Sequence, residues 1–201
     1  MRELSLHILD LIENSIRAGA STISVRIEEC PEQDRLEICV EDDGAGLRVP
    51  PDQAINPYYT TKEGKRTGLG LSLFQGAAEQ AGGTLTIGPS GLGGTAVTAV
   101  MQLSHADREP LGDLATTFSS VVCTNPHLDL RCSIKLGCGE CTLRVPDVAK
   151  ELRADDRYGL AIARRVSEKI RRHLAAPAWP SPLVEHRVWA PDGSRRRASD
   201  V

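Results

Sequence analysis

Aromatic residues are scarce in this sequence: two Trp, three Tyr and two Phe make up 3% of the 201 residues. The core is therefore expected to consist of Leu, Ile, Val and Ala. No apolar run approaches the ~20 residues that a membrane-spanning helix needs, and the start of the chain lacks a signal-peptide pattern. The net charge of -3 argues against a general nucleic-acid binder or a polybasic membrane protein. We expect a soluble, cytoplasmic protein that uses neither a membrane nor a nucleic acid as its partner.

Two common phosphate-binding signatures are also missing. In the best candidate for a P-loop, Gly64-Lys65 is followed by Arg66, and Tyr59 stands where the first glycine belongs. A formal dinucleotide-binding fingerprint occurs at residues 91–96. It leads from a turn into a strand rather than from a strand into a helix, so we reject it.

Glycine and charge divide the chain into two compositional units. Residues 1–103 hold 13 of the 18 glycines and carry a charge of -6, with 8 Lys/Arg against 14 Asp/Glu, whereas residues 104–201 carry +3. We therefore expect one domain over residues 1–103, a small α+β extension over residues 104–174 and a mostly disordered tail over residues 175–201, which holds four prolines and a basic triplet.

Hydrophobic periodicity gives the first unit a simple order of elements. Residues 2–18 and 69–81 have helical patterns, residues 22–41 alternate as a hairpin, and residues 84–87 and 95–103 alternate as two further strands. The segment 44–68 has little periodicity and is long enough to be a functional lid. Hairpins with helices on one face predict an α/β two-layer sandwich with a mixed, mainly antiparallel sheet.

Four short blocks in the first unit carry chemistry. Asp10 and Asn14 are one helical turn apart, so their oxygens can hold a hard cation and orient a water or hydroxyl. Asp42 and Asp43 follow an apolar strand. One of them can accept a hydrogen bond from an exocyclic amine, while the glycines after them allow a flat ring to approach the backbone. The third block, residues 67–71, enters a helix whose N-terminal amides can hold phosphates. The fourth block is Gly93-Gly94-Thr95.

In this order the four blocks resemble the N, G1, G2 and G3 boxes of the GHKL superfamily, which contains histidine kinases, DNA gyrase, the ninety-kilodalton heat-shock chaperones and MutL-type proteins. The resemblance covers about residues 3–103, and it is strongest to short stand-alone histidine-kinase-like ATP-binding proteins. It implies a Bergerat-type ATP-binding fold, with ATP and Mg²⁺ as cofactors.

The resemblance implies a role for each matching residue. Asn14 would coordinate Mg²⁺ through ATP, Asp42 would bind the adenine amine, and Thr95 would lie close to Asp42. The remaining matches are the glycines beside the ring, the lid positions that can reach phosphate, and the lid glycines with the residue between them: Gly44, Gly46, Thr61, Lys62, Gly68, Leu69 and Gly70.

The chain also departs from the family in two ways. Hydrolytic members carry Glu where this chain has Asp10, and Asp is one methylene shorter, so ATP binding is better supported than fast hydrolysis. A sensor kinase carries a phosphoacceptor histidine in a helix pair before the N box. Here His7 lies on the N-box helix itself, and we interpret it as a packing or surface residue. An acceptor would then be a separate protein.

The second unit contains four of the six cysteines, of which Cys138 and Cys141 form a C-x-x-C pair. With Cys123, His127 and Cys132 nearby in sequence, a zinc or iron–sulfur site is one interpretation, and reduced thiols in a hairpin are the other. We also expect an amphipathic helix over residues 158–174, packed on that hairpin, and either a linker or a short helix over residues 110–119.

Two functions remain open at this stage, while a third, a DNA-repair ATPase, is disfavoured by the short second unit and the slightly acidic net charge. One is an ATP- and Mg²⁺-dependent protein kinase or regulatory ATPase, with Asp10 as its catalytic base and a separate partner protein as phosphoacceptor. The other is a non-catalytic ATP-dependent switch or a metal-binding maturation or regulatory factor. The sequence does not decide whether the chain forms a homodimer.

Overall fold

The structure is a computed structural model, and it describes residues 3–47, 49–50, 54, 69–137 and 139–174. The first unit contains α1 (Leu4–Arg17), β1 (Thr22–Cys30), β2 (Arg35–Asp42), α3 (Leu69–Gln80), β3 (Thr84–Pro89) and β4 (Thr95–Gln102). The second contains α4 (Leu114–Thr124), β5 (Asp129–Leu136), β6 (Gly139–Arg144), α5 (Val145–Lys150) and α6 (Leu160–Leu174). The periodicity of the sequence thus placed the helices and strands of the first unit within a few residues.

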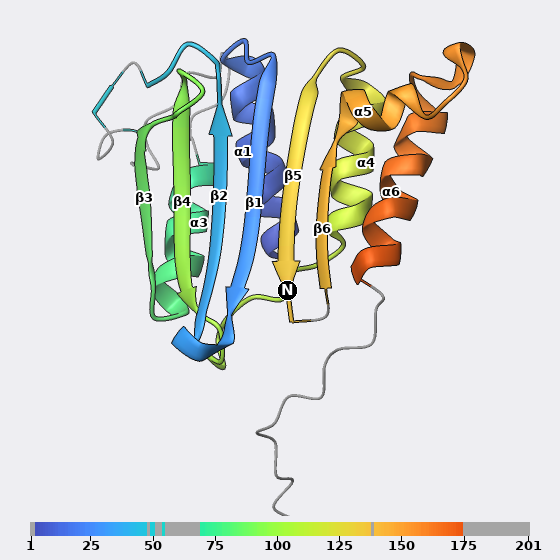
Figure 1. The fold of residues 1–201 in the computed structure, drawn as a ribbon. Helices are drawn as coiled ribbons and strands as arrows, with labels where there is room; N and C mark the ends of the chain where they lie inside the picture. Colours follow the sequence, from blue (N-terminus) through green and yellow to red (C-terminus); the bar gives the residue numbers. More distant parts are fainter. Residues whose placement is uncertain (1–2, 48, 51–53, 55–68, 138, 175–201) are drawn as a thin grey trace, which may run out of the picture.

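The strands form a single mixed sheet in the order β3-β4-β2-β1-β5-β6. Strands β1 and β5 pair in parallel, and every other neighbouring pair is antiparallel. Helices α1, α3, α4 and α6 lie on the same side of this sheet (Figure 1). The predicted α/β two-layer sandwich with a mainly antiparallel sheet is confirmed.

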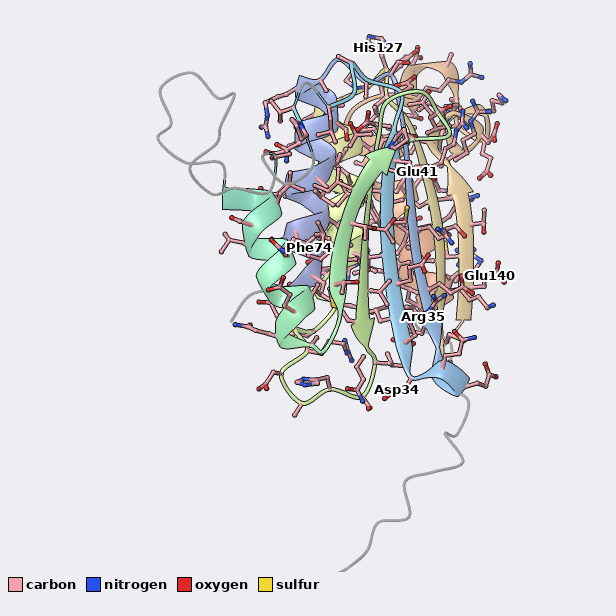
Figure 2. All side chains as sticks on the ribbon, turned by 90° about the vertical axis from the view of Figure 1, so that its left-hand side faces the viewer. Asp34, Arg35, Glu41, Phe74, His127 and Glu140 are labelled. Carbon is pink, nitrogen blue, oxygen red and sulfur yellow. The ribbon has the colours of Figure 1, made fainter. Side chains whose placement is uncertain are left out.

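The alternation of the strands explains why only one face is covered. On β1 the residues Ile23, Val25 and Ile27 are fully buried, and the polar residues between them face the other way. Figure 2 shows Phe74 on the helix side of the sheet, and Arg35 and Glu140 on the open side. Burial of one apolar face against a layer of helices supplies most of the driving force for this arrangement.

The extension continues the sheet of the first unit. Strand β5 pairs with β1 along seven residue pairs, from Thr22↔Asp129 to Glu28↔Lys135. Buried residues of both units belong to one hydrophobic cluster. The change of composition near residue 104 therefore does not coincide with a break in the sheet or in the core.

The segment that the sequence left open as a linker or short helix is resolved as a three-turn helix, α4. Its N-cap is Asp113, whose carboxylate accepts a hydrogen bond from the Thr116 amide at 3.0 Å. The helix buries Phe118 and Val121 against the core and packs against α6. Helix α6 also contacts β6, as expected for the amphipathic helix of the extension.

Candidate functional site

Asp42 is the centre of the candidate site, at the carboxyl end of β2. Its side chain lies on the helix-covered face and is only 5% exposed. Oδ2 accepts a hydrogen bond from Ser15 Oγ at 2.6 Å, and Oδ1 accepts from the amides of Gly44 at 2.9 Å and Thr95 at 3.1 Å. A carboxylate offers about four acceptor positions, so these three donors leave one position on Oδ2.

Glycine backbone closes around this carboxylate on two sides. The Gly94 amide donates to the Asp42 carbonyl at 3.0 Å, which holds the turn between β3 and β4 against the end of β2. A Cβ on Gly94 would overlap Asp42 Oδ1 and lie 2.6 Å from the Gly44 nitrogen, so no other residue fits there without movement. Gly46 adopts φ +72°, a left-handed conformation that favours glycine. A planar ring of a ligand can therefore pack against the glycine main chain beside Asp42, because glycine has no side chain to intervene.

Asp43, the neighbouring acidic residue, has a structural role: it binds the residues where β1 begins. Its carboxylate accepts hydrogen bonds from the Ser21 amide at 2.8 Å, the Ser21 hydroxyl at 2.6 Å and the Thr22 amide at 2.9 Å. These bonds, led by the Ser21 hydroxyl, lower the pKa of Asp43 to about 2. Asp43 thus ties the start of the glycine segment to the start of β1, and Asp42 is the carboxylate that faces the site.

Helix α1 brings a second set of polar groups to the same end of the molecule. Ser15, which contacts Asp42, follows Asn14 directly, and Asp10 lies one turn earlier and is exposed. The Asn14 side-chain oxygen Oδ1 accepts a hydrogen bond from the Arg17 guanidinium. A Cβ on Gly70 would lie 3.4 Å from Asp10 Oδ2, so the first turn of α3 is in van der Waals range of that carboxylate.

Most of the predicted site residues that the structure describes lie close together, and several other predicted site residues lie outside the described part of the chain. Asp42, Gly44 and Thr95 meet through hydrogen bonds, although Thr95 contributes its amide rather than its hydroxyl. Thr61, Lys62 and Gly68 lie outside the described residues, and the side chain of Leu69 is not described, although its backbone begins α3. Roles for all of these residues stay predictions.

The sequence assigned no role to two residues that shape the site, Ser15 and Gly94. Ser15 is 5% exposed and supplies the one hydroxyl that reaches Asp42 in the described chain. A signal existed for both: Ser15 directly follows Asn14 of the first block, and Gly94 lies inside the fourth block. Neither pattern says which atom of Asp42 it contacts, because that depends on how β2, α1 and the β3–β4 turn pack.

The interpretation of the second-unit cysteines as a metal site finds no support. Among the residues that the structure describes, no group of three or more His, Cys, Asp or Glu could hold a metal ion. Cys132 and Cys141 are buried in β5 and β6, and burial raises the pKa of both thiols, which disfavours the thiolate that binds metal. Cys123 is exposed on α4, and Cys138 lies outside the described residues.

His127 does not join these cysteines either. It lies at the end of the molecule where β5 begins (Figure 2), while Cys141 pairs with Ile134, roughly 15 Å further along that strand. The ring of His127 instead contacts Tyr158 edge-on at 6.0 Å.

His7 behaves as a packing residue, as interpreted from the sequence. Its ring is 4% exposed, stacks on Phe74 with 5.1 Å between centroids, and has Nε2 3.1 Å from the Glu109 carboxylate. Stacked and buried in this way, it is not presented to an approaching phosphoryl group.

Comparisons with known proteins identify the family of the first unit. Residues 2–105 match the profile of the family described as "Histidine kinase-, DNA gyrase B-, and HSP90-like ATPase". Because this match takes in more than half of the chain, the chain belongs to that ATPase family. It carries an ATP-binding domain of the histidine-kinase-like kind.

Similar sequences include several bacterial sensor kinases. The chain is 35% identical over 100 residues to the two-component sensor PprA of Pseudomonas aeruginosa, a match that covers 45% of this chain and 11% of that protein. It is 38% identical over 81 residues to the sensor histidine kinase ZraS of Klebsiella oxytoca, covering 39% of this chain and 17% of that protein. The chain thus spans less than a fifth of the length of these two relatives.

Among solved structures, the ATP-binding domain of PrrB from Mycobacterium tuberculosis shares 23% identity, with a TM-score of 0.37, over 49% of this chain and 66% of that one. An N-terminal domain of a DNA repair protein shares 14% identity, with a TM-score of 0.45, over 67% of this chain and 49% of that one. Within the described part of the chain, no helix has the length and apolar character required to cross a membrane.

Proposed function

We propose that this chain binds ATP with Mg²⁺ and passes the γ-phosphoryl group to a separate partner protein, as a histidine-kinase-like protein kinase or regulatory ATPase. The single observation that carries the proposal is the Asp42 carboxylate. It is buried, held by three donors and left with one acceptor position on Oδ2, beside glycine backbone. An exocyclic amine on a flat ring is the ligand that such an arrangement accepts best.

The residues of α1 fit the triphosphate end of such a ligand. Asn14 and Asp10 present hard oxygen donors one helical turn apart, and the Asn14 oxygen already accepts from a cationic group, the Arg17 guanidinium. Mg²⁺ bound with ATP would neutralise charge on the phosphates during in-line transfer. Arg17 would then have to release the Asn14 side-chain oxygen, and its guanidinium would keep its ion pair with Glu13 at 3.5 Å.

Asp10 is the residue we assign to the acceptor group. It is exposed, so a hydroxyl, imidazole or water of a partner can reach it, and it lies beside the first turn of α3. A carboxylate in this position would orient the nucleophile and accept its proton while the γ-phosphoryl group is transferred and ADP is left.

Calorimetric titration with ATP and Mg²⁺ tests the binding step. We expect saturable binding that is lost or strongly weakened in Asp42→Ala. The matched control is Glu41→Gln, which changes the neighbouring carboxylate on the opposite face of β2. Unaltered affinity in a folded Asp42→Ala protein would contradict the assignment of the adenine site.

The transfer step is tested by capturing partners on the ATP-loaded protein and following labelled γ-phosphate onto them. We expect transfer that falls in Asp10→Asn while ATP affinity is kept. Binding without any transfer or phosphate release, in both proteins, would favour the alternative, a switch in which ATP binding alone changes the partner-binding surface.

A further inference from the structure

A hollow of about 460 Å³ lies away from the nucleotide site, over β1, β5 and β6. Part of its polar lining comes from the open face of the sheet, where Ser24, Arg131, Ser133, Thr142 and Arg144 are neighbours in the register. The rest comes from the α5–α6 region, from Asp147, Glu151 and Lys169. Asp42 pairs with Ile23 on the helix-covered face, one residue before Ser24. Because consecutive strand residues point to opposite faces, these five strand residues and Asp42 are on opposite sides of the sheet.

Two arginines in the hollow share a single acidic partner. Asp129 Oδ2 accepts hydrogen bonds from Arg131 Nη2 at 2.8 Å and from Arg144 Nη2 at 2.6 Å. These contacts, led by Arg144, lower the pKa of Asp129, so its carboxylate stays ionised and orients both guanidiniums. The trio retains one net positive charge, and each guanidinium directs only part of its five N–H donors at Asp129.

Three hydroxyl side chains, those of Ser24, Ser133 and Thr142, are neighbours of the two arginines in the sheet. Ser133 pairs with Thr142 on β6 and lies next to Arg26 on β1, with Ser24 diagonally across. Within the described part of the chain, no side-chain hydrogen bond involves any of these three hydroxyls. They can therefore all donate to a bound ligand.

The acidic residues at the rim do not cancel the charge of the arginines. Glu151 is paired with Lys169 at 2.6 Å and with Arg165 at 3.4 Å, and Asp147 is paired with Lys150 at 2.7 Å. Each rim carboxylate is thus paired with a cation of the rim, although Asp147 also attracts Arg144. The excess charge that remains in the hollow is positive and lies beside free hydroxyl donors.

We propose that this hollow binds a phosphate monoester group. A phosphate monoester offers three acceptor oxygens and up to two negative charges, which matches two partly used guanidiniums and three hydroxyls. The volume is in the range of small-ligand sites, so the group can be carried by a phosphorylated side chain or by a small metabolite. This site is independent of the proposed ATP site.

The test is a two-dimensional ¹H–¹⁵N NMR titration of the full chain without nucleotide, with O-phosphoserine and inorganic phosphate as separate probes. We expect saturable shifts of the amides in β5 and β6 with at least one probe. Stronger binding of O-phosphoserine would indicate a phosphorylated side chain, and stronger binding of inorganic phosphate a small phosphate compound.

Three variants make the assignment specific. Arg144→Gln, and the double variant Ser133→Ala/Thr142→Val, should each weaken binding about tenfold or more, because each removes donors to a charged group. Lys135→Gln, an exposed cation on the same face of β5, should change the affinity by no more than about twofold. Shifts confined to residues 42–46 or 93–95, equal affinity in all variants, or no saturable shift would overturn the proposal.

Discussion

At the scale of single residues, two consecutive aspartates divide the work at the end of β2. Asp42 points into the site and keeps one acceptor position. The Asp43 carboxylate instead accepts hydrogen bonds from the Ser21 amide, the Ser21 hydroxyl and the Thr22 amide. The sequence marked the pair but could choose between them only by resemblance to a family. The choice becomes physical once the burial and hydrogen bonds of each carboxylate are known.

Gly94 is expected to tolerate no side chain. Gly94→Ala would force a Cβ against Asp42 and the Gly44 nitrogen, and overpacking of this kind costs about 1–3 kcal/mol of unfolding free energy. Gly88→Ala is the matched control, because a Cβ on Gly88 meets nothing within 4 Å. Urea denaturation should show a lower free energy of unfolding for Gly94→Ala than for Gly88→Ala. Equal stabilities would show that the β3–β4 turn can move to accommodate the added Cβ.

The pKa of Asp43 predicts a pH dependence. The pKa in the folded chain is about 2, below the ordinary value of 3.8, so the ionised form favours the folded state. Its contribution is complete above pH ~4 and is lost as the pH falls toward ~2. Urea denaturation between these pH values should show a shallower loss of stability in Asp43→Asn than in the unmodified chain. Parallel pH profiles would contradict this role.

At the scale of elements, the site is built by three segments that meet at one end of the sheet: α1, the end of β2 and the β3–β4 turn. The helices and strands that carry them follow from hydrophobic periodicity, and Gly82, with φ +69°, ends the α3 region as a C-terminal glycine should. The meeting of Ser15, Asp42 and Gly94 does not follow from periodicity, since it depends on tertiary packing over more than 50 residues of sequence.

The helix that the sequence left undecided, α4, offers an element-scale test. Asp113→Ala removes the acceptor for the Thr116 amide and should cost about 1 kcal/mol of unfolding free energy. Asp155→Ala is a suitable control, because that exposed carboxylate has no hydrogen bond in the described part of the chain. If chemical denaturation gives both variants the same free energy of unfolding, the Asp113 cap makes no net contribution to stability.

At the scale of the whole molecule, the two compositional units share one sheet and one hydrophobic cluster. Glycine content and charge change near residue 104, and this made a separate extension the natural expectation. The parallel pairing of β5 with β1 shows why pattern alone could not reveal the arrangement: a strand's alternation indicates which face is buried, not which neighbour it pairs with. The candidate metal site lacks support for a similar reason, because no three of its candidate ligands come together among the residues that the structure describes.

A shared sheet and core predict a shared unfolding transition. Residues 1–174 should unfold cooperatively, whereas a chain that ends at residue 112 should lose stability or aggregate, because it exposes the edge of β1 and the buried face that α4 and β5 cover. Calorimetric melting of both chains is the measurement. A shortened chain that keeps the melting temperature of the longer one would contradict the shared core.

The central claim is that Asp42 recognises an exocyclic amine, and the most direct measurement compares ATP with purine riboside triphosphate, which differs from ATP only in lacking that amine. In the presence of Mg²⁺, calorimetry should show ATP binding about tenfold or more tightly in the unmodified chain and in Glu41→Gln, since a hydrogen bond to a charged acceptor is lost with the amine. In Asp42→Ala the preference should disappear. Equal affinities for the two nucleotides in the unmodified chain, or an unchanged preference in a folded Asp42→Ala protein, would contradict the account.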